Sequence, residues 1–109
     1  MDFNDYQLAA SKTATYPDDV ALQGLIYCTL GLTGEAGEFA NKVKKIVRGD
    51  RTLDQARIDL VSELGDCLWY LSEAAKNLNV NLADIAFQNI GKLQSRRERG
   101  VVKGDGDNR

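Results

Sequence analysis

Residues 53–77, LDQARIDLVSELGDCLWYLSEAAKN, decide the fold of this chain. Apolar side chains recur there three or four residues apart, at Val61, Leu64, Leu68, Leu71 and Ala75. That spacing aligns them along one side of an α-helix, which turns once in about 3.6 residues. Thr52 or Asp54 stands where a helix favours a capping side chain. The stretch therefore predicts one long amphipathic helix.

Three more helices are expected on either side of it. The sequence predicts them at about 2–14, 19–47 and 82–97, and no segment alternates apolar and polar residues as a half-buried strand would. Pro17 separates the first two, since the residue before a proline disfavours helix. The predicted fold is all-α, a four-to-five-helix bundle.

The glycines of the second predicted helix allow two interpretations. Gly24, Gly31, Gly34 and Gly37 lie inside one helical run, where each costs up to about 1 kcal/mol relative to alanine. Either the helix is kinked or broken near Gly31–Gly34, or another backbone or a ligand approaches closely beside Glu35. The spacing favours neither.

The chain is long enough for one domain. We expect that domain at 1–99 and a mobile C-terminal tail at 100–109, which contains three glycines and mixed charges. Ile58 and Trp69 fall away from the apolar stripe of the 53–77 helix. Because 109 residues offer limited core to cover them, we expect homo-oligomerisation to complete the core.

Composition excludes several classes of protein. A formal net charge of −2 gives no overall attraction to nucleic acid, and no apolar run approaches the roughly 20 residues that span a bilayer. The acidic start of the chain lacks the pattern of a signal peptide, so a cytoplasmic location is expected. Histidine is absent, which excludes a Ser-His-Asp triad, a Cys-His pair and histidine-ligated metals.

Two acidic pairs are the main candidates for chemistry. Glu35 and Glu38 are three residues apart, as are Glu63 and Asp66. Residues at this spacing lie about 60° apart on a helix, so each pair can present two carboxylates side by side. Facing pairs would favour a hard cation such as Mg²⁺. The alternative is a solvated face with pairs such as Glu38–Lys42, and spacing alone does not exclude it.

The sequence also resembles a known family. The runs Gly34–Glu38 and Glu63–Tyr70, followed by Asn89–Arg96, resemble the signature of the MazG-like nucleotide pyrophosphohydrolases, which belong to the all-α NTP pyrophosphatase superfamily. In that pattern two glutamates three apart precede a Glu-x-x-Asp block, and here 24 residues separate the blocks. The chain departs from many relatives at Arg97, where an aromatic residue often stands.

The resemblance implies an activity and a cofactor. It implies that Glu35, Glu38, Glu63 and Asp66 bind Mg²⁺, with Mn²⁺ as a substitute. Family members cleave nucleoside triphosphates between the α and β phosphates, which yields a monophosphate and pyrophosphate. We further expect Glu38 to orient or deprotonate the attacking water.

Basic residues near the end of the chain are the expected partners of the phosphates. The last 18 residues hold six of the 14 lysines and arginines, and Asn89, Lys92 and Arg96 share one helical face. These charges also suit a helix C-terminus without any ligand. By the resemblance, Lys92 and Arg96 bind the β and γ phosphates while Asn89 hydrogen-bonds the substrate.

Two further residues are candidates for substrate binding. Lys42 is expected beside either the phosphates or the acids. Trp69 could stack on a base, although an aromatic side chain at helical spacing is more often part of a core.

The expected function is therefore Mg²⁺-dependent hydrolysis of a (d)NTP to (d)NMP and pyrophosphate, in the clearance of surplus or non-standard nucleotides. The expected partners are the nucleotide and one or three further copies of the chain, as a homodimer or homotetramer, with no nucleic acid polymer and no membrane. Two alternatives remain open: the same fold acting on a phosphoribosyl-nucleotide, and a non-catalytic helical interaction or regulatory protein.

Overall fold

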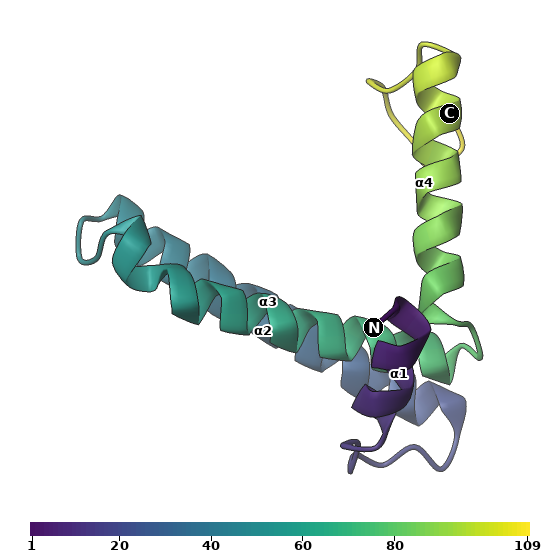
Figure 1. The fold of residues 1–109 in the computed structure, drawn as a ribbon, viewed down its shortest axis with the longest axis horizontal. Coiled ribbons are helices and arrows are strands. Elements are labelled where there is room, and N and C mark those ends of the chain that lie inside the picture. Colours follow the sequence, from purple (N-terminus) through teal and green to yellow (C-terminus); the bar gives the residue numbers. More distant parts are fainter.

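The computed structural model describes all 109 residues as four α-helices without a strand. The helices, shown in Figure 1, are α1 (Phe3–Ser11), α2 (Ala21–Val47), α3 (Leu53–Asn77) and α4 (Leu82–Glu98). The prediction of an all-α fold is confirmed, at the lower of the two expected numbers of helices. None of these helices has both the length and the apolar character needed to cross a bilayer.

The long helices α2 and α3 run side by side as a hairpin (Figure 1). A capping box begins α3: Gln55 N–H donates to Thr52 Oγ1, and Thr52 N–H donates to the Gln55 side chain. Gly49, whose φ of 90° suits glycine, follows the end of α2. These local signals place the turn between the helices where the sequence predicts it.

No break interrupts α2 at its glycines, so the alternative of two helices is wrong. A Cβ at Gly31 would lie 2.1 Å from the Tyr70 ring, and one at Gly24 would lie 2.0 Å from the side-chain oxygen of Asn77. No atom lies within 4 Å of a Cβ built at Gly34 or Gly37. At two of the four glycines, the absence of a side chain therefore leaves room for a side chain of α3.

The apolar stripe predicted for α3 lies mostly on the outside of the hairpin. Val61 is 62% exposed, and Leu64 and Leu71 are exposed as well. The buried apolar residues of α3 are Ala56, Leu60 and Ala75, of which only Ala75 belongs to the predicted stripe. Much of the stripe is left uncovered in one copy, because α3 has apolar residues on more than one side and α2 covers only one of them.

The short helix α1 joins the hairpin to α4. It ends at Ser11, three residues before its predicted end, and Thr13 Oγ1 donates to the carbonyl of Ala10. No side-chain cap from Asn81 satisfies the start of α4. Instead Leu82 N–H donates to Gln7 Oε1 at 3.0 Å, which fixes the base of α4 against α1.

Beyond its base, α4 projects away from the hairpin (Figure 1). It contacts α1 and α3 but not α2. The radius of gyration is 16.7 Å, whereas a compact chain of this length has about 13 Å. Ile58 and Phe87, on α3 and α4, are 83% and 82% exposed. A single copy thus leaves much apolar surface uncovered.

The segment 100–109, expected as a mobile tail, lies back along α4 (Figure 1). Arg109 Nε donates to the carbonyl of Val101 at 3.0 Å, and Arg99 Nη2 donates to the carbonyl of Arg109 at 2.8 Å. Gly100 and Gly106 have φ of 70° and 83°, which glycine adopts without strain. These contacts hold the end of the chain against the helix that precedes it.

Candidate metal centre

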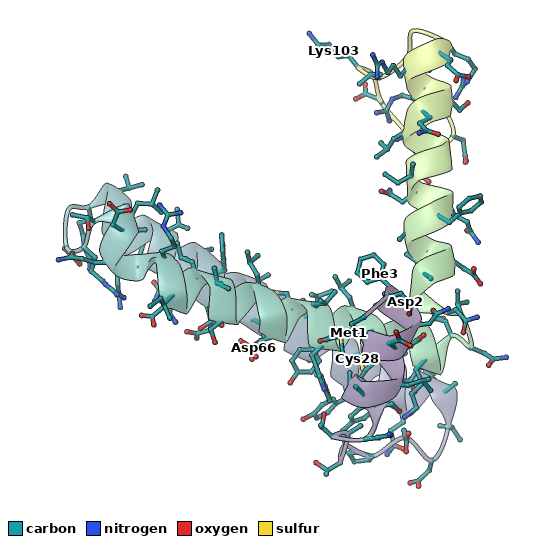
Figure 2. The ribbon with its side chains drawn as sticks, viewed as in Figure 1. Met1, Asp2, Phe3, Cys28, Asp66 and Lys103 are labelled. Carbon is teal, nitrogen blue, oxygen red and sulfur yellow. The ribbon has the colours of Figure 1, made fainter.

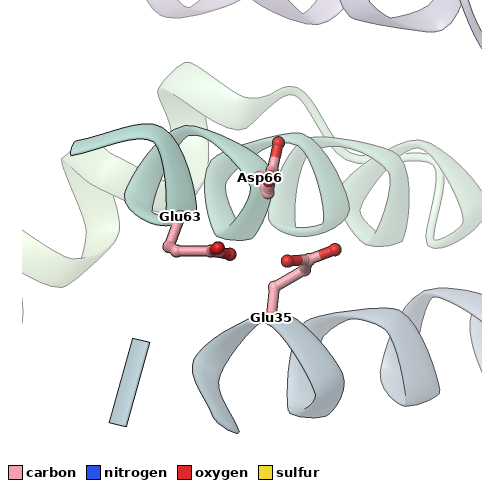
Figure 3. Close-up of side chains that lie close together, drawn as sticks. All are labelled: Glu35, Glu63 and Asp66. Carbon is pink, nitrogen blue, oxygen red and sulfur yellow. The ribbon is translucent and has the colours of Figure 1, made fainter. Parts of the chain in front are cut away.

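Three carboxylates meet between the two long helices. Glu35 comes from α2, and Glu63 and Asp66 come from α3. One carboxylate oxygen from each lies within 4.8 Å of the others. Figure 3 shows the three side chains close together between the two helices. The hairpin brings together residues about 30 positions apart, while the three-residue spacing on α3 sets Glu63 beside Asp66.

Glu63 has one oxygen paired and one unpaired. Its side chain is 12% exposed, and Oε1 accepts a hydrogen bond from Lys42 Nζ at 2.7 Å. Oε2 is buried and has no hydrogen-bond partner. A buried carboxylate oxygen without a partner costs free energy unless a ligand binds it. The all-oxygen donor set and this unpaired atom fit a hard cation such as Mg²⁺.

The charges of the cluster oppose one another when no cation is bound. The neighbouring Glu63 carboxylate is the main cause that raises the pKa of Glu35, followed by burial and the charge of Asp66. The hydrogen bond from Lys42 lowers the pKa of Glu63. Glu35 therefore takes up a proton more readily than an isolated glutamate does, and a divalent cation would compete with that proton.

Glu38 lies outside the group of three. It is exposed, one turn beyond Glu35 on α2, and its charge contributes to the raised pKa of Glu35. The structure thus brings three of the four acids together and leaves Glu38 at their edge. Lys42 pairs with Glu63 on the facing helix, and no Glu38–Lys42 ion pair forms.

Trp69 stands next to the acids. A hollow of about 370 Å³ is lined by Thr13, Glu35, Asp66, Trp69 and Tyr70. The indole N–H of Trp69 donates to Thr13 Oγ1 at 2.9 Å, and its ring packs edge-on against Tyr70 at 5.0 Å. Sequence reasoning missed Thr13, which lies 56 residues away in a loop without a motif.

The basic candidates of α4 lie elsewhere. Asn89 and Lys92 line a separate cleft with Ile85, Gln88 and Asp107. Arg96 is buried and contacts Asp107. The ribbon in Figure 2 shows α4 projecting from the hairpin that carries Asp66. Since α4 does not contact α2, one copy does not bring Asn89, Lys92 or Arg96 to the acids.

Comparisons with known proteins identify the family of this chain. Residues 23–101 match the MazG nucleotide pyrophosphohydrolase domain, a stretch that includes all three clustered acids and α4. The chain is 52% identical over 114 aligned positions to the gene 37 protein of Mycobacterium phage L5, with all of both chains covered. No solved structure matches. The chain belongs to the MazG nucleotide pyrophosphohydrolase family.

Proposed function

We propose that this chain hydrolyses nucleoside triphosphates to monophosphates and pyrophosphate, with a divalent cation held by Glu35, Glu63 and Asp66. Two observations carry the proposal: these three carboxylates meet, and Oε2 of Glu63 is buried without a hydrogen-bond partner. Acids on a solvated face would keep their oxygens in water, because burying a carboxylate oxygen without a partner costs free energy. Mg²⁺ is the expected cation and Mn²⁺ its substitute.

When bound, the cation would neutralise phosphate charge and increase the acidity of an attacking water. The residues of the chain supply the rest. Lys42 holds Glu63 in place through the 2.7 Å ion pair and keeps it ionised. Glu38, exposed at the edge of the three acids, is free to accept a proton from the water. Glu38 is thus proposed as the general base.

We place the base of the nucleotide beside Trp69. The hollow next to Glu35 and Asp66 contains the indole ring, which its hydrogen bond to Thr13 fixes in orientation. An aromatic face next to a site that binds phosphates suits a nucleobase, since every base has a π surface for stacking. Selectivity among bases would then depend on the residues around Trp69.

The proposed enzyme is a homodimer or homotetramer. The outer stripe of α3 with Val61 and Leu64, together with the projecting α4, exposes apolar side chains that a second copy would bury. The same association would allow Lys92 and Arg96 of one copy to approach the acids of another. A single triphosphate would then lie between the acids of one chain and the cations of another.

The test is product analysis over a panel of nucleotides. Purified protein with Mg²⁺ is incubated with each common and several modified dNTPs and NTPs, and with a phosphoribosyl-nucleotide. We expect pyrophosphate and a monophosphate from at least one nucleoside triphosphate, with preference for a surplus or non-standard dNTP. Release of orthophosphate, or turnover of the phosphoribosyl-nucleotide alone, would contradict the proposal.

A further inference from the structure

The carboxylate of Asp107 lies between two cations of α4. Its Oδ1 is 2.8 Å from Lys92 Nζ and 3.1 Å from Arg96 Nη2. The same guanidinium nitrogen also donates to the backbone carbonyl of Asp107. These two cations are the residues expected to bind substrate phosphates, and here an acid of the same chain holds both.

Lys92 and Arg96 form a site that requires an anion. They are four residues apart on α4, so their like charges repel unless a negative group lies between them. The side chain of Arg96 is only 8% exposed, so its charge is poorly solvated. An anion is therefore part of the stable state of this face, whether it comes from the tail or from a ligand.

Asp107 fills the site incompletely. One of its oxygens serves both cations, and only one guanidinium nitrogen of Arg96 is engaged. Arg96 Nε is buried and has no hydrogen-bond partner. Arginine binds oxyanions most strongly through two nitrogens at once, and a polyphosphate offers several oxygens for that geometry. A polyphosphate can therefore satisfy this site better than the tail does.

The ion pairs of Asp107 with Lys92 and Arg96 are also easily broken. The Asp107 side chain is 74% exposed on its outer side, so solvent and salt weaken its attraction to the cations. The tail returns to α4 through Gly100 and Gly106, which allow the chain to reverse direction. Little apolar surface holds the tail in place, since Val102 is exposed.

We propose that Lys92 and Arg96 form a polyphosphate-binding site that the carboxylate of Asp107 occupies in the free protein, so that the tail competes with the ligand. The role of this site in turnover rests on the proposed function, whereas binding of a polyphosphate to Lys92 and Arg96 does not depend on it. Release of Asp107 is then a step that substrate binding must drive, and the tail sets the apparent affinity of the enzyme for its substrate.

Calorimetric titration with inorganic tripolyphosphate in EDTA tests this competition without turnover. Asp107→Asn removes the competing charge, and we expect it to tighten binding about threefold to tenfold relative to the unaltered chain. Asp105→Asn removes an equal charge from the same tail at a residue without an ion pair, and should change affinity less than about twofold. Asp107→Glu should restore the weaker binding.

A further variant tests whether Lys92 is one of the cations that bind tripolyphosphate when Asp107 is replaced. Lys92→Gln should weaken binding, and adding Asp107→Asn to it should bring a smaller gain than in the unaltered chain. The proposal is overturned if Asp107→Asn binds tripolyphosphate no more tightly than Asp105→Asn does, with both folded by circular dichroism. It is also overturned if the gain persists undiminished with Lys92→Gln. If the competition holds but no nucleotide is hydrolysed, only the proposed function fails.

Discussion

The α2/α3 hairpin and α4 carry opposite halves of the same expected site. On the hairpin, residues from two helices meet: Glu35 and Glu63 face each other, and Lys42 supports Glu63 from the opposite helix. On α4, Lys92 and Arg96 meet only the tail of their own chain. One copy therefore brings three acids together, but it does not bring Lys92 and Arg96 to them.

The largest expected effect is on the hairpin. Asp66→Asn removes one ligand charge from the three-acid cluster, and turnover should fall about a thousandfold, since the loss of a group that stabilises developing charge costs 10²–10³ or more. Pyrophosphate release at saturating Mg²⁺ measures it. Glu98→Gln, an exposed acid at the end of α4, is the matched control and should keep full activity. Comparable activity in the two folded variants would remove the acids from the mechanism.

A second variant separates the edge of the cluster from its centre. Glu38→Gln should lower kcat about a hundredfold, as expected for loss of a general base. Because Glu38 lies outside the group of three acids, the affinity of the Glu38→Gln variant for Mn²⁺ should differ from that of the unaltered chain by less than about threefold. Titration of Mn²⁺ alongside steady-state kinetics gives both values. A loss of Mn²⁺ affinity as large as that of Asp66→Asn would make Glu38 a ligand instead.

The relation between the two regions is tested by association. Val61 is 62% exposed in one copy, so Val61→Glu in a monomer should change stability by less than about 0.5 kcal/mol. If α3 packs on a second copy, the same change should yield monomers in sedimentation and reduce activity about thirtyfold, because a buried charge disrupts the interface. Val47→Glu, at the far end of the hairpin, is the control. Unchanged association in Val61→Glu would rule out this stripe as the interface.

The contribution of α4 should be smaller and should appear in KM. Lys92→Gln removes one phosphate contact, for which we expect about a tenfold rise in KM with little change in kcat. Lys103→Gln, in the tail and without an ion pair, provides the comparison. A fall in kcat without a change in KM would place Lys92 at the reacting phosphate rather than in substrate binding.

The smallest effect is on stability and depends on pH. Glu35 has a raised pKa, so without metal its contribution to stability is complete below its ordinary pKa of about 4.3 and is lost as pH rises through the raised value. A cation binds the deprotonated cluster, and the rise in Tm caused by Mg²⁺ should be a few degrees larger at pH 7.5 than at pH 5. Asp66→Asn should abolish the difference. An equal shift at both pH values would show that Mg²⁺ acts elsewhere.

Local signals predicted the helices well. The bounds of α3 follow from the capping side chain of Thr52 and from the turn after Asn77, both of which act within a few residues. The prediction for α1 extended three residues too far, since its end is fixed by the contact of Thr13 with Ala10 rather than by composition. The close approach of Tyr70 to Gly31 could not be predicted, because it depends on how a second helix packs against α2.

Contacts between residues far apart in the chain were harder to predict from the sequence. Helical spacing put Glu63 beside Asp66, but only the hairpin shows that Glu35 joins them while Glu38 stays at the edge. The outward position of Val61 depends on which side of α3 meets α2, and two apolar sides compete for that contact. The return of Asp107 to Lys92 depends on a glycine-rich tail that has no periodic pattern.

Binding of Mn²⁺ in the absence of nucleotide tests the central claim most directly, because it depends on the three acids alone. Electron paramagnetic resonance of free Mn²⁺ measures the affinity of the unaltered chain, Asp66→Asn and Glu98→Gln at pH 7.5. We predict saturable binding in the unaltered chain and in Glu98→Gln, and a loss of at least about tenfold in affinity in Asp66→Asn. Equal affinity in all three folded proteins would contradict a metal centre at Glu35, Glu63 and Asp66.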